Sequence, residues 1–172
     1  LKEAAERPQV NFVGVERAQK YFRHTLERIE KGKLANVRLI CADAHELFSR
    51  YVRSTSLQAI HIYFPDPWPK KRHHKRRLIT PGFLTHAARC LTARGALYLA
   101  TDEAQYFEFI IGEVDACRLF SRRDDSRFLQ RLVSQTREFP VADAQCENET
   151  AYLTHYERKY RLEGRRIYGA HY

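Results

Sequence analysis

Four carboxylates stand where apolar runs of the sequence end, at Glu16, Asp43, Asp66 and Asp102. If these runs are parallel strands, the acids converge on one crevice, because open parallel sheets bind ligands beyond the carboxyl ends of their strands. A carboxylate there can accept hydrogen bonds from two ribose hydroxyls or from an adenine amino group. One such acid is more often the N-cap of the next helix. Four in register indicate a cofactor with a ribose and an amine, and NAD and S-adenosylmethionine fit equally well.

The segments that must position these acids alternate between two hydrophobic periods. Period-2 runs predict strands and period-3.6 stripes predict amphipathic helices. Thr80 caps one of these helices and Pro81 opens it. Short connections between alternating strands and helices indicate parallel βαβ units in an α/β fold, with helices on both sheet faces. The predicted strands are 11–16, 37–43, 59–64 and 95–102, and the predicted helices are 17–31, 44–52, 80–91 and 103–114.

The last third of the chain is less regular. We expect a strand at 117–120, mixed helix and loop at 126–138, a polar loop at 140–150, a helix at 154–163 and a final strand at 167–172. No internal repeat and no linker divides the sequence. It is therefore predicted to be a single domain over residues 1–172.

Positive charge is concentrated in residues 70–77, the basic run, which reads Lys-Lys-Arg-His-His-Lys-Arg-Arg. Its six fixed charges compare with a net charge of +9 for all 172 residues. A basic run is usually a solvated surface. This one is internal and follows a proline-rich segment at a predicted strand end, where a dense cationic loop suits a phosphate backbone.

Composition excludes several classes of protein. With 44% hydrophobic and 12% aromatic residues, the chain is neither disordered nor fibrous. Its four cysteines form no close pair, which argues against a zinc site. Cys41 and Cys90 are predicted to be buried reduced thiols. No apolar run reaches the ~18 residues of a membrane span and no signal peptide heads the sequence, so cytoplasmic localisation is expected.

One segment makes a specific resemblance. Residues 62–78, Ile-Tyr-Phe-Pro-Asp-Pro-Trp-Pro followed by the basic run and Leu78, resemble the signature of bacterial tRNA (guanine-N7-)-methyltransferases, the TrmB family. Residues 12–16, 41–44, 100–102 with Tyr106, and 154–157 agree in the same order, so the resemblance covers essentially the whole chain. It implies a class I S-adenosylmethionine-dependent methyltransferase fold, Rossmann-like, with a mostly parallel sheet. It also implies methyl transfer from S-adenosylmethionine to guanine N7 in the tRNA variable loop.

The resemblance implies a role for each matching residue. Glu16 would take the cofactor ribose, Asp43 the adenine region, and Asp66 would lie at the methyl-transfer centre, touching cofactor and substrate. Thr154 and Glu157 also fit a helix capping box. The adjacent His73 and His74 make a poor metal site among cations, so no metal is expected. The residues implied to contact tRNA are Lys70, Arg72, His73, His74, Lys75, Arg76 and Arg77, and those implied to line the guanine side are Asp102, Thr154, Tyr156 and Glu157.

The chemistry of guanine fits these residue types. N7 carries a lone pair at neutral pH, so no base has to remove a proton, and catalysis rests on alignment of N7 with the methyl group. Asp66 can accept from the guanine edge and stabilise the positive charge that develops on the purine. Pro65, Pro67 and Pro69 stiffen the loop that carries it. Trp68 could stack on a base or pack against the sheet.

The sequence departs from the family at its beginning. The family's first strand and its Glu-x-Gly-x-Gly turn are absent from the 172 residues. We expect the chain to be an N-terminally truncated piece, whose neighbouring strands lack a ladder partner. The alternative is a non-catalytic tRNA- or RNA-binding module that has lost cofactor binding. Monomer and homodimer are both left open.

Overall fold

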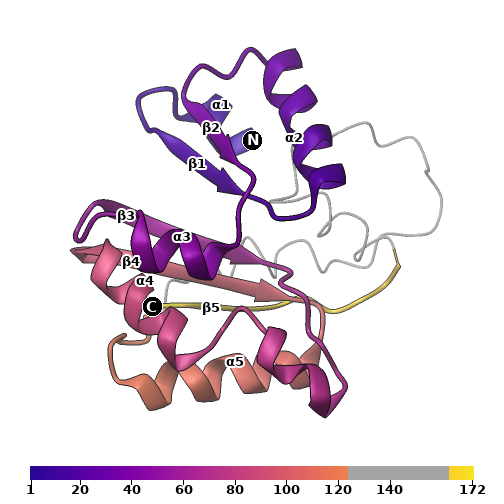
Figure 1. The fold of residues 1–172 in the computed structure, drawn as a ribbon, viewed down its shortest axis with the longest axis vertical. Coiled ribbons are helices and arrows are strands. Elements are labelled where there is room, and N and C mark those ends of the chain that lie inside the picture. Colours follow the sequence, from indigo (N-terminus) through magenta and orange to yellow (C-terminus); the bar gives the residue numbers. More distant parts are fainter. Residues whose placement is uncertain (124–162) are drawn as a thin grey trace. The chain divides into compact units, whose positions relative to one another are not determined.

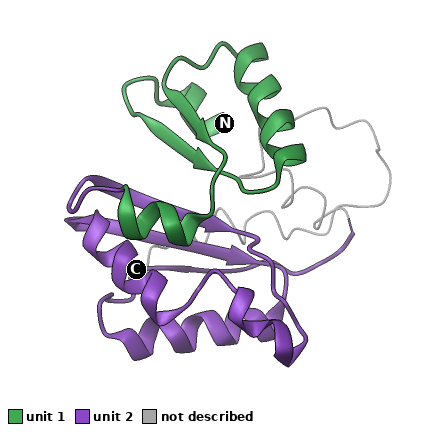
Figure 2. Ribbon diagram, in the orientation of Figure 1, with its two compact units in different colours: residues 1–51 green, residues 52–172 purple. Residues whose placement is uncertain are grey.

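The computed structural model describes residues 1–123 and 163–172 (Figure 1). The described chain forms two compact units, Leu1–Tyr51 and Val52–Tyr172, which are taken separately below (Figure 2). The prediction of a single domain stays a prediction. The first unit contains α1 (Lys2–Glu6), β1 (Phe12–Val15), α2 (Gln19–Lys31), β2 (Val37–Ile40) and α3 (Ala44–Arg50). The second contains β3 (Leu57–Tyr63), the 3₁₀ helix η1 (Lys71–Arg76), α4 (Pro81–Cys90), β4 (Leu91–Thr101), α5 (Ala104–Cys117) and β5 (Tyr168–His171).

The first unit is a βαβ crossover. β1 and β2 are parallel, with Phe12 opposite Val37 and Val15 opposite Ile40. Ile29 of α2 packs with Val37 and Ala4 in a small apolar core. A parallel pair needs a crossover connection, and the amphipathic α2 supplies it.

Asn36 holds the beginning of this unit together. Its side-chain amide donates hydrogen bonds to the carbonyl oxygens of Ala4, Arg7 and Val10, at 2.9, 3.1 and 2.8 Å. These three carbonyl groups lie at the end of α1 and in the turn before β1, where neither a helix nor a strand ladder satisfies them fully. One side chain therefore fixes the entry into both strands of the unit.

The second unit is a three-stranded sheet in the order β3–β4–β5. β3 and β4 are parallel and β5 is antiparallel to β4. One face buries Ile60, Leu97 and Leu99, and α4 and α5 lie together on one side of this sheet (Figure 1). The opposite face carries a cross-strand column in which Tyr98 stacks between His61 and His171, with ring centroids 4.6 and 4.3 Å apart.

Helix α4 begins as the sequence predicts. Thr80 is its N-cap, with the side-chain oxygen accepting from the amide of Phe83 at 3.2 Å, and Pro81 occupies the first turn. Its apolar face buries Phe83 and Leu84 completely. The helix passes without a loop into β4 at Leu91, four residues earlier than the predicted start of that strand.

Most predicted elements are confirmed to within a few residues, and two expectations are wrong. Residues 117–120 are not a strand, because α5 continues to Cys117 and ends at Arg118, whose φ of 53° is left-handed. Cys41 is exposed, whereas Cys90 is buried as predicted. The segments predicted at 126–138, 140–150 and 154–163 lie outside the described residues.

The strands form two separate ladders. β1 pairs with β2, and β3 with β4, but no pairing among the described residues joins β1 to β3. Each of these two strands therefore has one edge without a ladder partner in the described part of the chain.

Candidate functional site

The two acids of the first unit lie just before helices, and only Asp43 is an N-cap. Glu16 directly follows β1, and its Oε1 accepts from the amide of Ala18, the N-cap of α2, at 2.7 Å. Asp43 is the N-cap of α3, and its Oδ1 accepts from the amide of His45 at 2.8 Å. A carboxylate at a helix N-terminus is stabilised by the exposed amides and by the helix dipole. Each acid uses one oxygen for this purpose.

Glu16 and Asp43 also share one edge of the β1–β2 sheet. Parallel strands bring their carboxyl ends together, and Arg17, next to Glu16, places its Nη1 3.4 Å from Oδ2 of Asp43. Both side chains are exposed, so this ion pair contributes less than about 1 kcal/mol and a ligand can displace it. The predicted convergence of these two acids is therefore confirmed within the first unit.

In the second unit, Asp66 lies on a strained loop, residues 64–69, called here the Asp66 segment. The amide of Phe64 donates to the carbonyl of Ala100 at 2.7 Å, which anchors the segment to β4. Phe64 and Trp68 have left-handed φ values of 54° and 44°. A left-handed φ costs a bulky residue about 1–2 kcal/mol. Such strain persists where the surroundings enforce it and is typical of functional segments. Asp66 itself is exposed.

Trp68 packs against the basic run. Its ring meets the ring of His73 edge-on, with centroids 5.6 Å apart, and the Cζ of Arg76 lies 5.0 Å from its centroid. Trp68 is half-buried, and a cation over its indole contributes at least about 0.5–1 kcal/mol. The contacts of Trp68 are thus with the basic run, and the choice between base stacking and packing against the sheet stays open.

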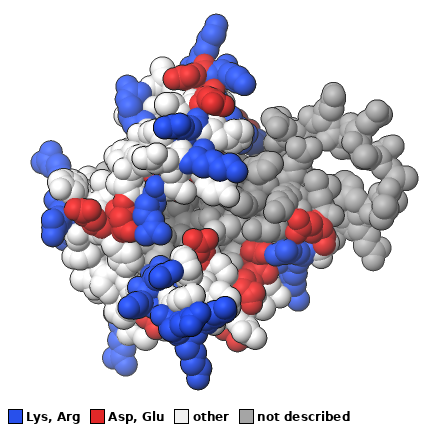
Figure 3. Space-filling view, turned by 45° about the vertical axis from the view of Figure 1, so that its right-hand side comes forward, with Lys and Arg blue, Asp and Glu red and all other residues white. Residues whose placement is uncertain are grey.

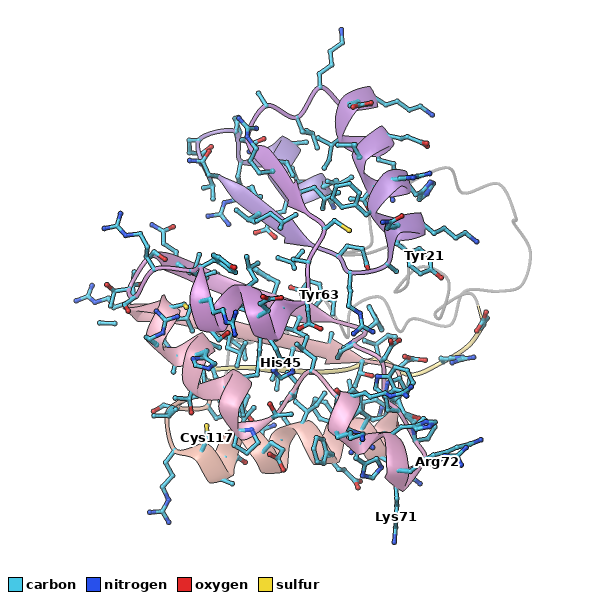
Figure 4. All side chains as sticks on the ribbon, in the orientation of Figure 1. Tyr21, His45, Tyr63, Lys71, Arg72 and Cys117 are labelled. Carbon is cyan, nitrogen blue, oxygen red and sulfur yellow. The ribbon has the colours of Figure 1, made fainter. Side chains whose placement is uncertain are left out.

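The basic run is mostly an exposed 3₁₀ helix, η1. Lys71 and Arg72 project away from the ribbon (Figure 4), and Lys and Arg side chains gather at the lower end of the view in Figure 3. Residues three apart eclipse in a 3₁₀ helix, so Arg72 and Lys75 lie on one ridge. Within residues 1–123 and 163–172, no ion pair involves the five exposed cations. These are Lys70, Lys71, Arg72, Lys75 and Arg76, and His73 and His74 are half-buried.

Arg77 differs from the rest of the basic run. Arg77 is only 8% exposed, and its Nε donates to the carbonyl oxygen of Pro67 at 2.9 Å. The guanidinium lies over the rings of Tyr106 and Phe109, with Cζ 5.0 and 4.3 Å from their centroids. The expectation that Arg77 contacts tRNA conflicts with this burial, because the planar group is enclosed between the loop and α5.

Tyr106 connects Arg77 electrostatically to Asp66. Burial raises the pKa of Tyr106 to about 12, the charge of Arg77 opposes this rise, and the carboxylate of Asp66 adds to it. Tyr106 is therefore close enough to both Arg77 and Asp66 for their charges to affect its pKa. Composition gives no signal for this arrangement, because nothing distinguishes Arg77 from its basic neighbours in the sequence.

Asp102 follows β4 as Asp66 follows β3, so the two acids lie beyond the same edge of the second sheet. Oδ2 of Asp102 is 2.8 Å from Nη1 of Arg165, and the Nε of Arg165 is 3.0 Å from Oε2 of Glu163. Sequence reasoning missed Arg165, which lies 63 residues away along the chain. Thr154, Tyr156 and Glu157 lie outside the described residues, so their roles stay predictions.

Membrane-spanning helices and metal-binding clusters are both absent from the described part of the chain. No helix there is long and apolar enough to cross a membrane. No three His, Cys, Asp or Glu side chains there are grouped so that they could hold a metal ion.

Comparison with known proteins decides the family. A family model described as "Putative methyltransferase" matches residues 1–170. A tRNA (guanine-N(7)-)-methyltransferase of Leptospira interrogans is 36% identical over 168 residues, which cover 96% of this chain and 68% of that protein. The chain belongs to the tRNA (guanine-N7-)-methyltransferase family.

Other matches fix the extent and the fold. The family member of Alkalilimnicola ehrlichii is 41% identical over 115 residues, 67% of this chain and 48% of that protein. The chain thus spans about half the length of some curated family members that it matches. The solved structure of an antibiotic-related methyltransferase aligns with 99% of this chain and 79% of its own, with a TM-score of 0.61 and 17% identity. This likeness confirms the class I methyltransferase fold.

Proposed function

We propose that this chain transfers a methyl group from S-adenosylmethionine to N7 of a guanine in the variable loop of tRNA. The observation that carries the proposal is the exposed Asp66, held on a strained segment between β3 and a row of exposed cations. The chain belongs to the tRNA (guanine-N7-)-methyltransferase family, and a hydrogen-bond acceptor next to exposed cations supports this proposal because the cations suit a polyanion.

The reaction needs alignment more than proton transfer. N7 attacks through a free lone pair, so no base is required, and positive charge moves onto the purine as the bond to the methyl group forms. Asp66 accepts from N1–H and the amino group of the guanine, and its negative charge stabilises the developing cation. Adenine lacks this pair of donors, so the same contact selects guanine.

The cofactor supplies the methyl group as an electrophile on sulfur. Glu16 and Asp43 suit its donors, because in each acid only one carboxylate oxygen accepts from a backbone amide. Glu16 would accept from the ribose hydroxyls, and Asp43 would bind in the adenine region. Asp66 would also contact the cofactor.

The exposed cations would bind the tRNA backbone. Each of Lys70, Arg72, Lys75 and Arg76 is able to neutralise one phosphate, and counterion release then drives binding. His73 and His74 would add contacts along the same helix. Because the reaction needs no Lewis acid, we propose that it runs without a metal. The site of tRNA modification would be the cytoplasm, and sedimentation would distinguish a monomer from a homodimer.

The direct test is incubation of the chain with unmodified tRNA and methyl-labelled S-adenosylmethionine. We expect label in 7-methylguanosine after digestion of the tRNA, and none with the Asp66→Asn variant. Label at another atom, or equal label with the variant, would contradict the proposal.

A second candidate is a non-catalytic RNA-binding module. The observation that favours it is the group of five exposed cations in the basic run, which suits RNA binding by charge alone. It predicts tRNA binding that falls steeply with salt and no heat of cofactor binding in calorimetry. Measurable affinity of this chain for S-adenosylmethionine would exclude it.

A further inference from the structure

One residue of the basic run is buried, whereas the residues directly before it are exposed. Arg77 is buried at 8% exposure, whereas Lys75 and Arg76 directly before it are exposed. A buried guanidinium is costly unless its charge and its N–H groups are matched. In Arg77, Nε–H is matched by the carbonyl of Pro67 at 2.9 Å.

The positive charge of Arg77 is matched by aromatic rings. Tyr106 and Phe109 lie three residues apart on α5, so both point from one face of the helix. Their centroids are 6.0 Å apart, and Cζ of Arg77 lies within 5.0 Å of both. A desolvated cation over two ring faces is attracted by the negative face of each ring.

These contacts close a loop. Pro67 and Arg77 are ten residues apart, and the hydrogen bond between them joins the two ends of the segment that contains η1. Inside the loop, Trp68 packs against His73 and Arg76. On the other side of Asp66, the amide of Phe64 donates a hydrogen bond to the carbonyl of Ala100 in β4. Asp66 is therefore fixed on both flanks, to β4 through Phe64 and to α5 through Arg77.

We propose that Arg77 is a positioning residue that fixes Asp66 and the exposed cations relative to α5, and that it does not bind tRNA. The catalytic part of this inference rests on the proposed function. The left-handed φ of Trp68 supports it, because a strained backbone next to Asp66 needs a contact that enforces it.

The chemistry explains why arginine stands here. The Nε–H of arginine is held in the plane of the guanidinium, so one group can donate along its edge and stack through its faces. Lysine has a compact ammonium with no flat face and no donor at the Nε position. Charge alone therefore cannot replace the side chain.

The first experiment needs no catalysis. Trp68 is the single tryptophan of the chain, so intrinsic emission reports on this loop. For Arg77→Gln and Arg77→Lys, we expect emission shifted to the red and acrylamide quenching increased severalfold. Arg72→Gln is the matched control and should leave both unchanged, since Arg72 has no recorded contact with Trp68. Unchanged emission and quenching in both Arg77 variants would overturn the positioning role.

The second experiment separates positioning from RNA contact. Losing one phosphate contact lowers the slope of log K against log salt concentration by about 0.7–0.9. We expect that fall for Arg72→Gln and no change of slope for Arg77→Gln. A slope lowered equally in both variants would show that Arg77 is an RNA contact and would refute the proposal.

Turnover gives the third readout. Both Arg77 variants should lose at least tenfold in kcat, with the Kd for tRNA changed less than threefold, and Lys should not rescue. Normal kcat in Arg77→Lys would contradict the stacking argument. If the wild-type chain does not methylate tRNA, the proposed function fails, while emission and salt slope still decide the positioning role. If Arg77→Gln does not fold, Phe109→Leu keeps an apolar side chain there and should shift Trp68 emission in the same direction.

Discussion

Nη1 of Arg165 lies 2.8 Å from Oδ2 of Asp102, a carboxylate whose side chain is only 14% exposed. A guanidinium presents N–H donors in one plane, as the N1–H and amino group of guanine do. The ion pair therefore occupies one oxygen of a carboxylate that the family resemblance assigns to the guanine side. A guanine donor that binds this oxygen has to displace Arg165.

Removing Arg165 should strengthen substrate binding. Because half-exposed Arg165 contributes no more than about 1 kcal/mol to the pair, Arg165→Gln should lower the KM for tRNA by up to about fivefold. Glu163→Gln, which removes the charge of a second carboxylate paired with Arg165, is the control and should not lower KM. In an Asp102→Asn background, the effect of Arg165→Gln should vanish. A raised KM in the single variant would mean that Arg165 supports binding.

Asp66→Asn should abolish turnover without loss of tRNA binding. Losing an electrostatic stabiliser of the transition state costs about 10²–10³ in kcat. Single-turnover methylation and filter binding measure the two effects separately. Glu108→Gln changes an exposed carboxylate of α5 in the same unit and should behave as the wild type. Full activity of Asp66→Asn would remove this residue from the mechanism.

The exposed cations should act additively on tRNA binding. Lys75→Ala with Arg76→Ala should lower the salt slope by about 1.4–1.8, the share of two phosphates. The matched change of exposed Lys31 and Lys33 in the first unit should leave the slope unaltered. Equal losses in both double variants would indicate attraction by net charge instead of a defined surface.

Tyr106 predicts a loss of stability at alkaline pH. Burial raises its pKa to about 12, above the value of about 10 in an unfolded chain. Its contribution is thus complete below pH 10 and is lost as pH rises from about 10 to about 12, by up to about 3 kcal/mol. Chemical unfolding over this range should show a smaller decline for Tyr106→Phe.

The control is Tyr51→Phe, which removes an exposed phenol and should decline as the wild type does. Burial and Asp115 also raise the pKa of Tyr172 to about 12, so Tyr106→Phe removes only part of the decline. The same alkaline decline in Tyr106→Phe and wild type would show that Tyr106 does not contribute to it.

Sequence patterns predicted helix starts well where capping residues or proline mark them within a few residues. Thr80 and Pro81 mark the start of α4 because capping and a fixed φ act within a few residues. The end of α5 was predicted three residues early and a strand was expected after it. The apolar residues near Cys117 fit either element, and the left-handed turn at Arg118 has no glycine to mark it.

The site was predictable as a set of acids but not as a set of contacts. Glu16 and Asp43 follow paired strands, so topology alone brings them to one edge. The partners of Arg77 and Asp102 depend on packing between segments distant in sequence, which no local pattern encodes. The basic run in particular reads as one uniform surface, and only the fold separates Arg77 from its neighbours.

The exposed η1 has a consequence for handling the protein. A protease that cuts after Lys and Arg meets five exposed targets between residues 70 and 76, on a short 3₁₀ helix with weak internal hydrogen bonds. Cleavage there needs only local opening, at far lower free energy than global unfolding. A bound polyanion would cover the same residues. Trypsin resistance conferred by RNA would therefore map the footprint of the ligand on this helix.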